Sequence, residues 1–98
     1  MAYLSIDRNG QENICNEKPH RQGRKEIDEE TYTVYENEDG YIEACCYIQG
    51  CGIDYKEAEK SDLSYWVSDE SEMTTLPSGS IEKLIGHKMA FEDEPYCL

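Results

Sequence analysis

The sequence predicts an α+β fold, in which a small antiparallel β-sheet carries one short helix in the C-terminal half of the chain. Several short segments rich in β-branched and aromatic residues lie between turn-forming residues, which is typical of antiparallel strands. One segment near residue 80 places its apolar residues at helical spacing and ends in glycine. Neither a repeat nor a linker interrupts the 98 residues, so we expect a single domain over residues 1–98.

The N-terminal segment predicts a hairpin followed by a loop. Residues 3–7 alternate large apolar with polar side chains, which indicates a strand. Asn9-Gly10 favours a two-residue type I′ turn with positive φ at both positions, so residues 12–16 return as a second strand. Residues 18–25 are mostly basic and contain a proline and a glycine, which predicts a loop.

The middle of the chain predicts a second pair of strands. Residues 31–35 are all β-branched or aromatic, and residues 41–48 return after a turn at residues 37–40. Gly50-Cys51-Gly52 ends the returning strand. Residues 55–60 fit either one helical turn or a loop.

The C-terminal part predicts further strands around the helix. Residues 63–68, which include Trp66, indicate a strand, and residues 72–76 are expected to pair with it across a turn at residues 69–71. Residues 87–91 are expected to form a last strand, and Pro95 ends it.

The helix is short and has signals at both ends. Ser78 or Ser80 supplies an N-cap side chain, and Gly86 stands where the residue after a helix commonly adopts a left-handed conformation. The apolar stripe between them consists of Ile81, Leu84 and Ile85.

The negative charge is confined to the middle of the chain. The formal net charge is −13, and residues 26–72 hold 15 acidic residues against only Lys56 and Lys60, which accounts for all of it. Such a field repels nucleic acid and attracts basic surfaces. We therefore predict a protein partner with a basic, nucleic-acid-binding groove, and no direct contact with nucleic acid. The alternative is a solvated acidic face that only keeps the protein soluble.

The residues predicted to bind this partner share an acidic side chain and lie in three runs of the sequence. They are Glu26, Asp28, Glu29, Glu30, Glu36, Glu38, Asp39, Glu43, Asp54, Glu57 and Glu59. Carboxylates pair with arginine in a bidentate geometry, which supplies direction as well as attraction.

Five cysteines suggest a second kind of site. Cys45, Cys46 and Cys51 fall within seven residues, and an odd count leaves one thiol without a disulfide partner. One interpretation is a structural zinc site, in which Cys45 or Cys46 joins Cys51 and the set is completed from more distant residues. The candidates for completing it are Cys15, Cys97 and His87. The other interpretation is that these cysteines are small buried hydrophobic residues.

Catalysis has little support in the sequence, and membrane insertion has none. An enzyme that uses Cys51 and a histidine is the remaining alternative, but it requires a low thiol pKa, which nothing in the sequence indicates. The sequence contains neither a glycine-rich phosphate loop nor a nucleophile elbow nor an HExxH motif, so we predict that the protein is not an enzyme. No apolar run approaches the roughly 18 residues of a membrane span. The N-terminus has neither the basic nor the long apolar region of a secretion signal, which predicts a cytoplasmic location.

The two ends of the chain resemble small uncharacterised proteins of phages and prophages. The resemblance lies in residues 76–86 with Phe91-Glu92-Asp93-Glu94-Pro95, and in residues 3–10 followed by Lys18-Pro19. Small acidic phage proteins include anti-CRISPR and anti-restriction inhibitors, so the resemblance implies a phage-encoded inhibitor as a class. Because the acidic middle departs from these proteins, we expect any special function to lie there.

Two hypotheses follow. The first is an anti-CRISPR protein in the host cytoplasm, acting as a monomer or weak homodimer, which binds a CRISPR effector nuclease of the Cas9 type. It would act as a DNA mimic and block the basic channel that holds nucleic acid. The second is a zinc-stabilised phage accessory or interaction module whose partner is not specified.

Overall fold

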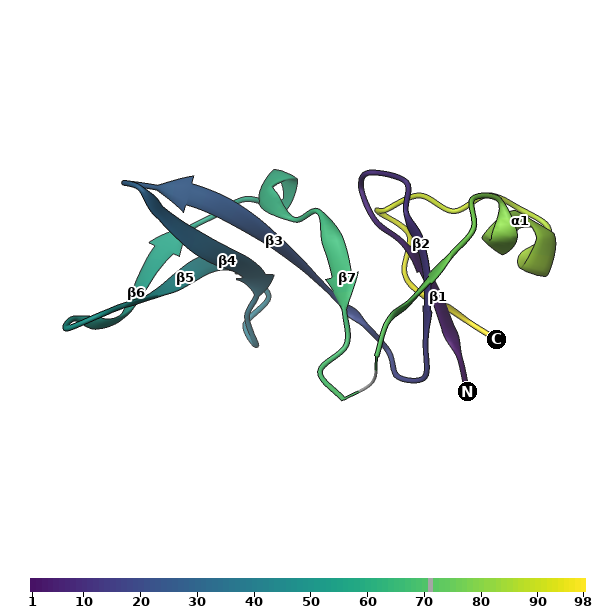
Figure 1. The fold of residues 1–98 in the computed structure, drawn as a ribbon, viewed down its shortest axis with the longest axis horizontal. Coiled ribbons are helices and arrows are strands. Elements are labelled where there is room, and N and C mark those ends of the chain that lie inside the picture. Colours follow the sequence, from purple (N-terminus) through teal and green to yellow (C-terminus); the bar gives the residue numbers. More distant parts are fainter. Residues whose placement is uncertain (71) are drawn as a thin grey trace. The chain divides into compact units, whose positions relative to one another are not determined.

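The computed structural model describes residues 1–70 and 72–98, and these are built mainly from antiparallel strands. The predicted α+β class is confirmed in this coarse sense, since one short α-helix in the C-terminal half accompanies the strands within the described residues (Figure 1). The prediction of a single sheet is wrong, because the strands form two sheets. Some strands pair with a neighbour in a hairpin, as β1 (Tyr3–Ile6) does with β2 (Glu12–Cys15), and others pair with a distant segment, as β2 does with β8 (Thr74–Leu76).

Contacts divide the chain into two compact units. Unit 1 consists of residues 1–20 and 65–98, and unit 2 of residues 21–64. Unit 2 is therefore a continuous segment inserted between the two segments of unit 1. That residues 1–98 form a single domain stays a prediction.

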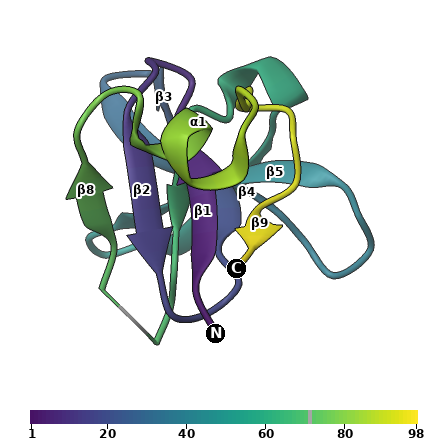
Figure 2. The same cartoon turned by 90° about the vertical axis from the view of Figure 1, so that its right-hand side faces the viewer.

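Unit 1 contains a sheet in which both of its segments take part. Its strand order is β8 (Thr74–Leu76), β2 (Glu12–Cys15), β1 (Tyr3–Ile6) and β9 (Tyr96–Cys97), with antiparallel pairs throughout (Figure 2). The central β1–β2 hairpin comes from the first segment, and the outer strands come from the second. The hydrogen bonds of β8 and β9 thus close the unit across the insertion.

A polar network beside Trp66 completes that closure. Trp66, in β7 (Tyr65–Val67), donates its backbone N–H to Asp7 Oδ1 at 2.9 Å and its indole N–H to the Ile6 carbonyl at 3.0 Å. Asn13 Nδ2 donates to the same Asp7 oxygen at 3.0 Å. Burial raises the pKa of Asp7, which these two hydrogen bonds partly oppose. The Trp66 ring packs against Phe91 with the ring centroids 6.0 Å apart.

The helix α1 (Ser80–Ile85) is capped by a residue that is distant in sequence. The buried Glu12 carboxylate accepts hydrogen bonds from the backbone N–H groups of Gly79 at 2.5 Å and Ile81 at 2.7 Å. The predicted serine cap is wrong, since no side chain of the helix start caps it and Ser80 Oγ donates to the Pro77 carbonyl instead. Gly86 ends the helix at φ +83°, as predicted.

The apolar stripe of this helix is buried only in part. Ile81 is fully buried, whereas Leu84 is 56% exposed. In the described part of the chain, no helix has the length and apolar character required to cross a membrane.

Unit 2 is an antiparallel meander. Its strands follow the order β6 (Gly52–Glu57), β5 (Ile42–Ile48), β4 (Glu30–Glu36) and β3 (His20–Ile27), and a short 3-10 helix, η1 (Lys60–Asp62), follows them. The core of the unit consists of Tyr32, Val34, Ala44 and Leu63. The register places the first three on the same face of the sheet. The opposite face is solvated.

The predicted loop over residues 18–25 is wrong, because most of this segment belongs to β3. Gly23 does not break the strand. It packs directly against the backbone at the end of η1, at Asp62 and Leu63. A Cβ atom at Gly23 would lie 1.8 Å from the backbone oxygen of Asp62, so no other residue fits. Ser64 N–H donates to the Gln22 carbonyl at 2.8 Å, and Lys25 pairs with Asp62 at 3.1 Å.

The first hairpin is present, but its predicted type I′ turn is wrong. Gly10 has φ +92° and Asn9 does not have a positive φ. Asp7 N–H donates to the Gln11 carbonyl and Gly10 N–H to the Asp7 carbonyl, so the turn is longer by one residue. The same pattern of hydrogen bonds recurs in the predicted turn that begins at Asn37.

Three further predictions need correction. Residues 55–60 are neither a helical turn nor a loop alone, because β6 extends to Glu57. Residues 74–76 pair with β2 and not with residues 63–68, and Ser71 of the predicted turn lies outside the described residues. Residues 87–91 are not a strand, and the last strand, β9, follows Pro95. Strands β8 and β9 pair with β2 and β1, which are distant in sequence, so no local signal predicts these two pairings.

The Asp7 network predicts a difference between two substitutions. Asp7→Ala should lower the free energy of unfolding by about 2–3 kcal/mol, because it removes the acceptor of the Trp66 backbone N–H and of the shorter Asn13 hydrogen bond. Asp7→Asn keeps an acceptor oxygen and removes the buried charge, so it should stay within about 1 kcal/mol of the wild type. Urea denaturation followed by Trp66 fluorescence at pH 7 measures both values, and equal losses in the two variants would contradict this role.

Candidate partner-binding surface

All eleven carboxylates predicted to bind a partner belong to unit 2, but they do not form one continuous face. Ten of them gather at the two ends of its sheet. The β3–β4 cluster lies at one turn and contains Glu26, Asp28, Glu29 and Glu30. The β4–β5 cluster lies at the opposite end and contains Glu36, Glu38, Asp39, Glu43, Glu57 and Glu59. The length of β4 separates the clusters by about 20 Å, at about 3.3 Å per residue.

Asp54 lies between the clusters and is already engaged. Tyr32 Oη donates to Asp54 Oδ2 at 2.6 Å, and Lys56 Nζ lies 3.6 Å from the same oxygen. The hydrogen bond from Tyr32 lowers the pKa of Asp54, and Asp54 raises the pKa of Tyr32 to about 12. Asp54 therefore links strands β6 and β4 of the sheet, and it is less available to a partner than the carboxylates at the two ends.

The β3–β4 cluster is displayed on a strained turn. Asp28 and Glu29 connect the paired residues Ile27 and Glu30, with φ values of +50° and +70°. These are the conformations of a type I′ turn, which favours asparagine and glycine. Keeping two acidic residues there costs stability, and the result is a doubly charged, exposed tip.

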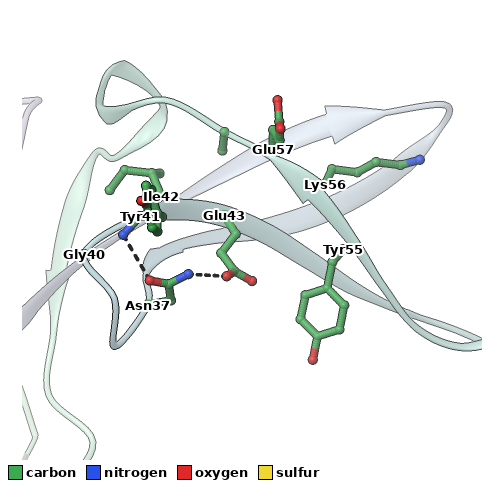
Figure 3. A pocket seen from close by; sticks show the side chains of 9 residues that line it. Asn37, Gly40, Tyr41, Ile42, Glu43, Tyr55, Lys56 and Glu57 are labelled. Atoms are coloured by element: carbon green, nitrogen blue, oxygen red, sulfur yellow. Dashed lines mark hydrogen bonds between the residues drawn. The ribbon is translucent and has the colours of Figure 1, made fainter.

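Two carboxylates of the β4–β5 cluster, Glu43 and Glu57, line a shallow pocket of about 680 Å³ (Figure 3). Its lining comes from the β4–β5 turn, the start of β5 and the end of β6, and consists of Asn37, Gly40, Tyr41, Ile42, Glu43, Tyr55, Lys56, Glu57 and Ala58. In Figure 3 the side chains of Asn37, Glu43 and Tyr55 lie on one side of the strands. The pocket thus combines aromatic surface with carboxylates.

Glu43 is held in one position within this pocket. Tyr35 Oη donates to Glu43 Oε2 at 3.0 Å, and Asn37 Nδ2 donates to Glu43 Oε1. The Asn37 amide is itself fixed, because its oxygen accepts hydrogen bonds from the backbone N–H groups of Asp39 at 2.9 Å and Tyr41 at 3.0 Å. Each Glu43 oxygen keeps a lone pair for a further donor.

Exposed tyrosine side chains lie on the rest of this surface. Tyr41 is 72% exposed and Tyr55 is 58% exposed. The register puts Tyr55 opposite Cys45, and Tyr47 opposite Ile53, on the same face as Glu43. A guanidinium or ammonium group would find a carboxylate partner and an aromatic ring together here.

The cysteines predicted to bind zinc are spread over both units. Cys45 and Cys46 lie on opposite faces of β5, and Cys51 lies in an exposed turn. Cys15, Cys97 and His87 belong to unit 1, where Cys15 is buried and donates to the Glu17 carbonyl at 2.9 Å. Over residues 1–70 and 72–98, no group of three or more His, Cys, Asp or Glu residues is arranged to hold a metal ion.

Zinc binding therefore stays a prediction, and the described residues do not bring the predicted ligands together. Burial, with the nearby Glu30 and Asp54 carboxylates, raises the pKa of the Cys46 thiol. A protonated thiol is a poor metal ligand and a poor nucleophile.

Comparison with known proteins gives no relative from which to transfer a function. No family model, no curated protein and no solved structure matches the chain.

Sequence reasoning found the carboxylates but missed the groups that organise them. Tyr35, Asn37 and Tyr55 carry no charge. The sequence predicts a strand at Tyr35, a turn at Asn37, and either a helical turn or a loop at Tyr55. The available signal was the spacing: Asn37 begins a turn that ends in Gly40, and Glu43 follows at the distance where a returning strand faces Tyr35.

The contact between Tyr35 and Glu43 predicts a shifted titration. Burial and the hydrogen bond to Glu43 raise the pKa of Tyr35 to about 12. Replacing Glu43 by glutamine removes the negative charge, so the pKa of Tyr35 should fall, while Glu38→Gln should leave it unchanged. Ring-carbon NMR between pH 9 and pH 12.5, with the Tyr35 signal assigned from Tyr35→Phe, measures this value. An unaltered Tyr35 titration in Glu43→Gln would show that Glu43 is not fixed against it.

Proposed function

We propose that this protein is a non-catalytic inhibitor that uses unit 2 to bind the cationic surface of a nucleic-acid-binding protein. The observation that carries the proposal is the Glu43 carboxylate, fixed by Tyr35 and Asn37 in a pocket with exposed tyrosines. The target is expected, from the resemblance of the chain ends to phage proteins, to be a CRISPR effector nuclease of the Cas9 type.

The chemistry of the pocket favours an arginine side chain of the partner. Arginine presents several N–H donors in a planar fork, which matches a carboxylate, and its plane stacks on aromatic rings. Glu43 is already oriented, so little side-chain entropy is lost when the partner binds. The neighbouring Glu36, Glu57 and Glu59 add attraction without a fixed geometry.

The spacing of the two acidic clusters supports the binding of a surface that normally holds a nucleic acid. One strand of DNA presents a phosphate about every 3.4 Å, so about 20 Å corresponds to about six phosphates. Basic channels that track such a backbone carry cationic side chains over similar lengths. The two clusters would contact two parts of one such channel.

The arrangement of the chain also supports the proposal. Unit 2 is inserted between the two segments of unit 1, and the residues that resemble phage proteins lie in unit 1. The residues predicted to bind a partner thus lie outside the part of the chain that resembles phage proteins. A protein family that keeps unit 1 and varies the insertion would change its target without changing its frame.

A direct test measures DNA cleavage and binding by a Cas9–guide complex. We expect the protein to inhibit cleavage, and we expect Glu43→Arg to weaken binding at least tenfold, since it places a positive charge in the pocket. Glu82→Arg makes the same change of charge in the exposed part of α1, outside unit 2, and should weaken binding less than twofold. Raising the salt concentration should weaken binding.

The outcomes separate three cases. Undiminished cleavage at excess protein would remove this nuclease as the target. Equal losses in Glu43→Arg and Glu82→Arg would show that total charge, and not the pocket, governs binding. Binding that is insensitive to salt would contradict the electrostatic basis of the proposal.

A further inference from the structure

Strand β6 leaves one edge of the unit 2 sheet open. It pairs with β5 along its whole length, and no strand of the described residues pairs with its other side. Its residues are exposed except for Asp54, which is half-buried. The strand contains no proline, and its backbone N–H and C=O groups on the outer side are a template for another strand.

The face beside this edge is also uncovered. Ile53 and Tyr55 are each 58% exposed, and Tyr47, which lies opposite Ile53, is 73% exposed. Exposed apolar side chains next to an open edge are what a strand from a second molecule would cover.

The sequence of β6 is complementary to itself. In an antiparallel pair of two identical strands around a two-fold axis perpendicular to the sheet, facing residues must come from the same side of the sheet. Three registers near the middle of β6 satisfy this condition. Centring on Asp54 would place two aspartates opposite each other, and centring on Lys56 would do the same with two lysines. Only centring on Tyr55 places each Asp54 opposite a Lys56.

We propose that two copies of this chain associate through β6 in the register centred on Tyr55, so that the unit 2 sheets of both copies become continuous. The two Tyr55 side chains lie opposite each other on the open face, and an aromatic pair across two strands stabilises a sheet. Two Asp54–Lys56 pairs lie on the other face, and each Glu57 faces Ile53 at the ends. Lys56 Nζ already lies 3.6 Å from Asp54 Oδ2 of its own strand, so both side chains lie on the face where the pairs between the two copies would form.

The charge of the chain limits the strength of this contact but not its register. Each copy has a net charge of −13, so the copies repel at long range. Added salt screens that repulsion, whereas the backbone hydrogen bonds between the strands do not depend on it. Self-association is therefore expected to strengthen with salt, the opposite of the dependence expected for the cationic partner.

The test is sedimentation velocity of the purified chain without any partner, over a concentration range up to about 1 mM. The mass should rise from 11.3 kDa toward twice that value, and more readily at high salt. Lys56→Asp should weaken association at least tenfold, because four aspartates then face one another. Lys83→Asp makes the same change of charge in α1 and should leave association unchanged.

A mixing experiment tests the register itself. Asp54→Lys should also be monomeric, because lysines then face lysines. An equimolar mixture of Asp54→Lys and Lys56→Asp should restore dimers, since every facing pair is again of opposite charge. Dimerisation of Lys56→Asp alone, or no dimer from two folded variants, would overturn the register.

Hydrogen exchange of the wild type gives a measurement that does not depend on the folding of variants. Asp54→Lys loses the hydrogen bond from Tyr32, so its fold must be checked by circular dichroism. In the wild type, amide protection of residues 52–57 should rise with protein concentration, while that of β9 should not. A monomer at every concentration and salt, with exchange of β6 independent of concentration, would overturn the proposal.

Discussion

The structure depends on the closure of unit 1 by two carboxylates that are distant in sequence from the groups they bind. Glu12 accepts the backbone N–H groups at the start of α1, and Asp7 accepts the N–H of Trp66. Removing these carboxylates from water is costly, and backbone donors that would otherwise be unsatisfied offset that cost. Closure of unit 1 brings residues 20 and 65 into one unit, and Ser64 meets Gln22 within unit 2, so the insertion begins and ends at neighbouring positions.

This closure explains which elements the sequence could predict. The strands around residues 31–35 and 41–48 were predictable because β-branched and aromatic residues favour strands locally. Strand β3 was not, since its side chains are charged and the need for Gly23 arises only when the backbone of Asp62 passes over it. The helix cap and the pairing of β8 with β2 also depend on partners more than 55 residues away along the chain, which local patterns do not contain.

The candidate site was predictable in composition but not in arrangement. Counting charges locates an acidic stretch, most of which becomes part of unit 2, but it gives all of its carboxylates equal weight. The register separates them: Asp54 is engaged by Tyr32, Glu43 is held by Tyr35 and Asn37, and the others divide between two ends of the sheet. An acidic segment of the same composition with a different register would not place Glu43 opposite Tyr35.

The two proposals meet at β6. Tyr55 and Lys56 line the pocket around Glu43 and also occupy the centre of the inferred strand pair. A cationic partner and a second copy of the chain would therefore contact the same residues. If both cannot bind at the same time, each would lower the apparent affinity of the other. Net repulsion between copies would keep the proposed strand pair weak, and a weak pair is easily displaced. An open edge is compatible with a strongly charged protein, because the charge that would limit self-association is the same charge that would attract the proposed partner.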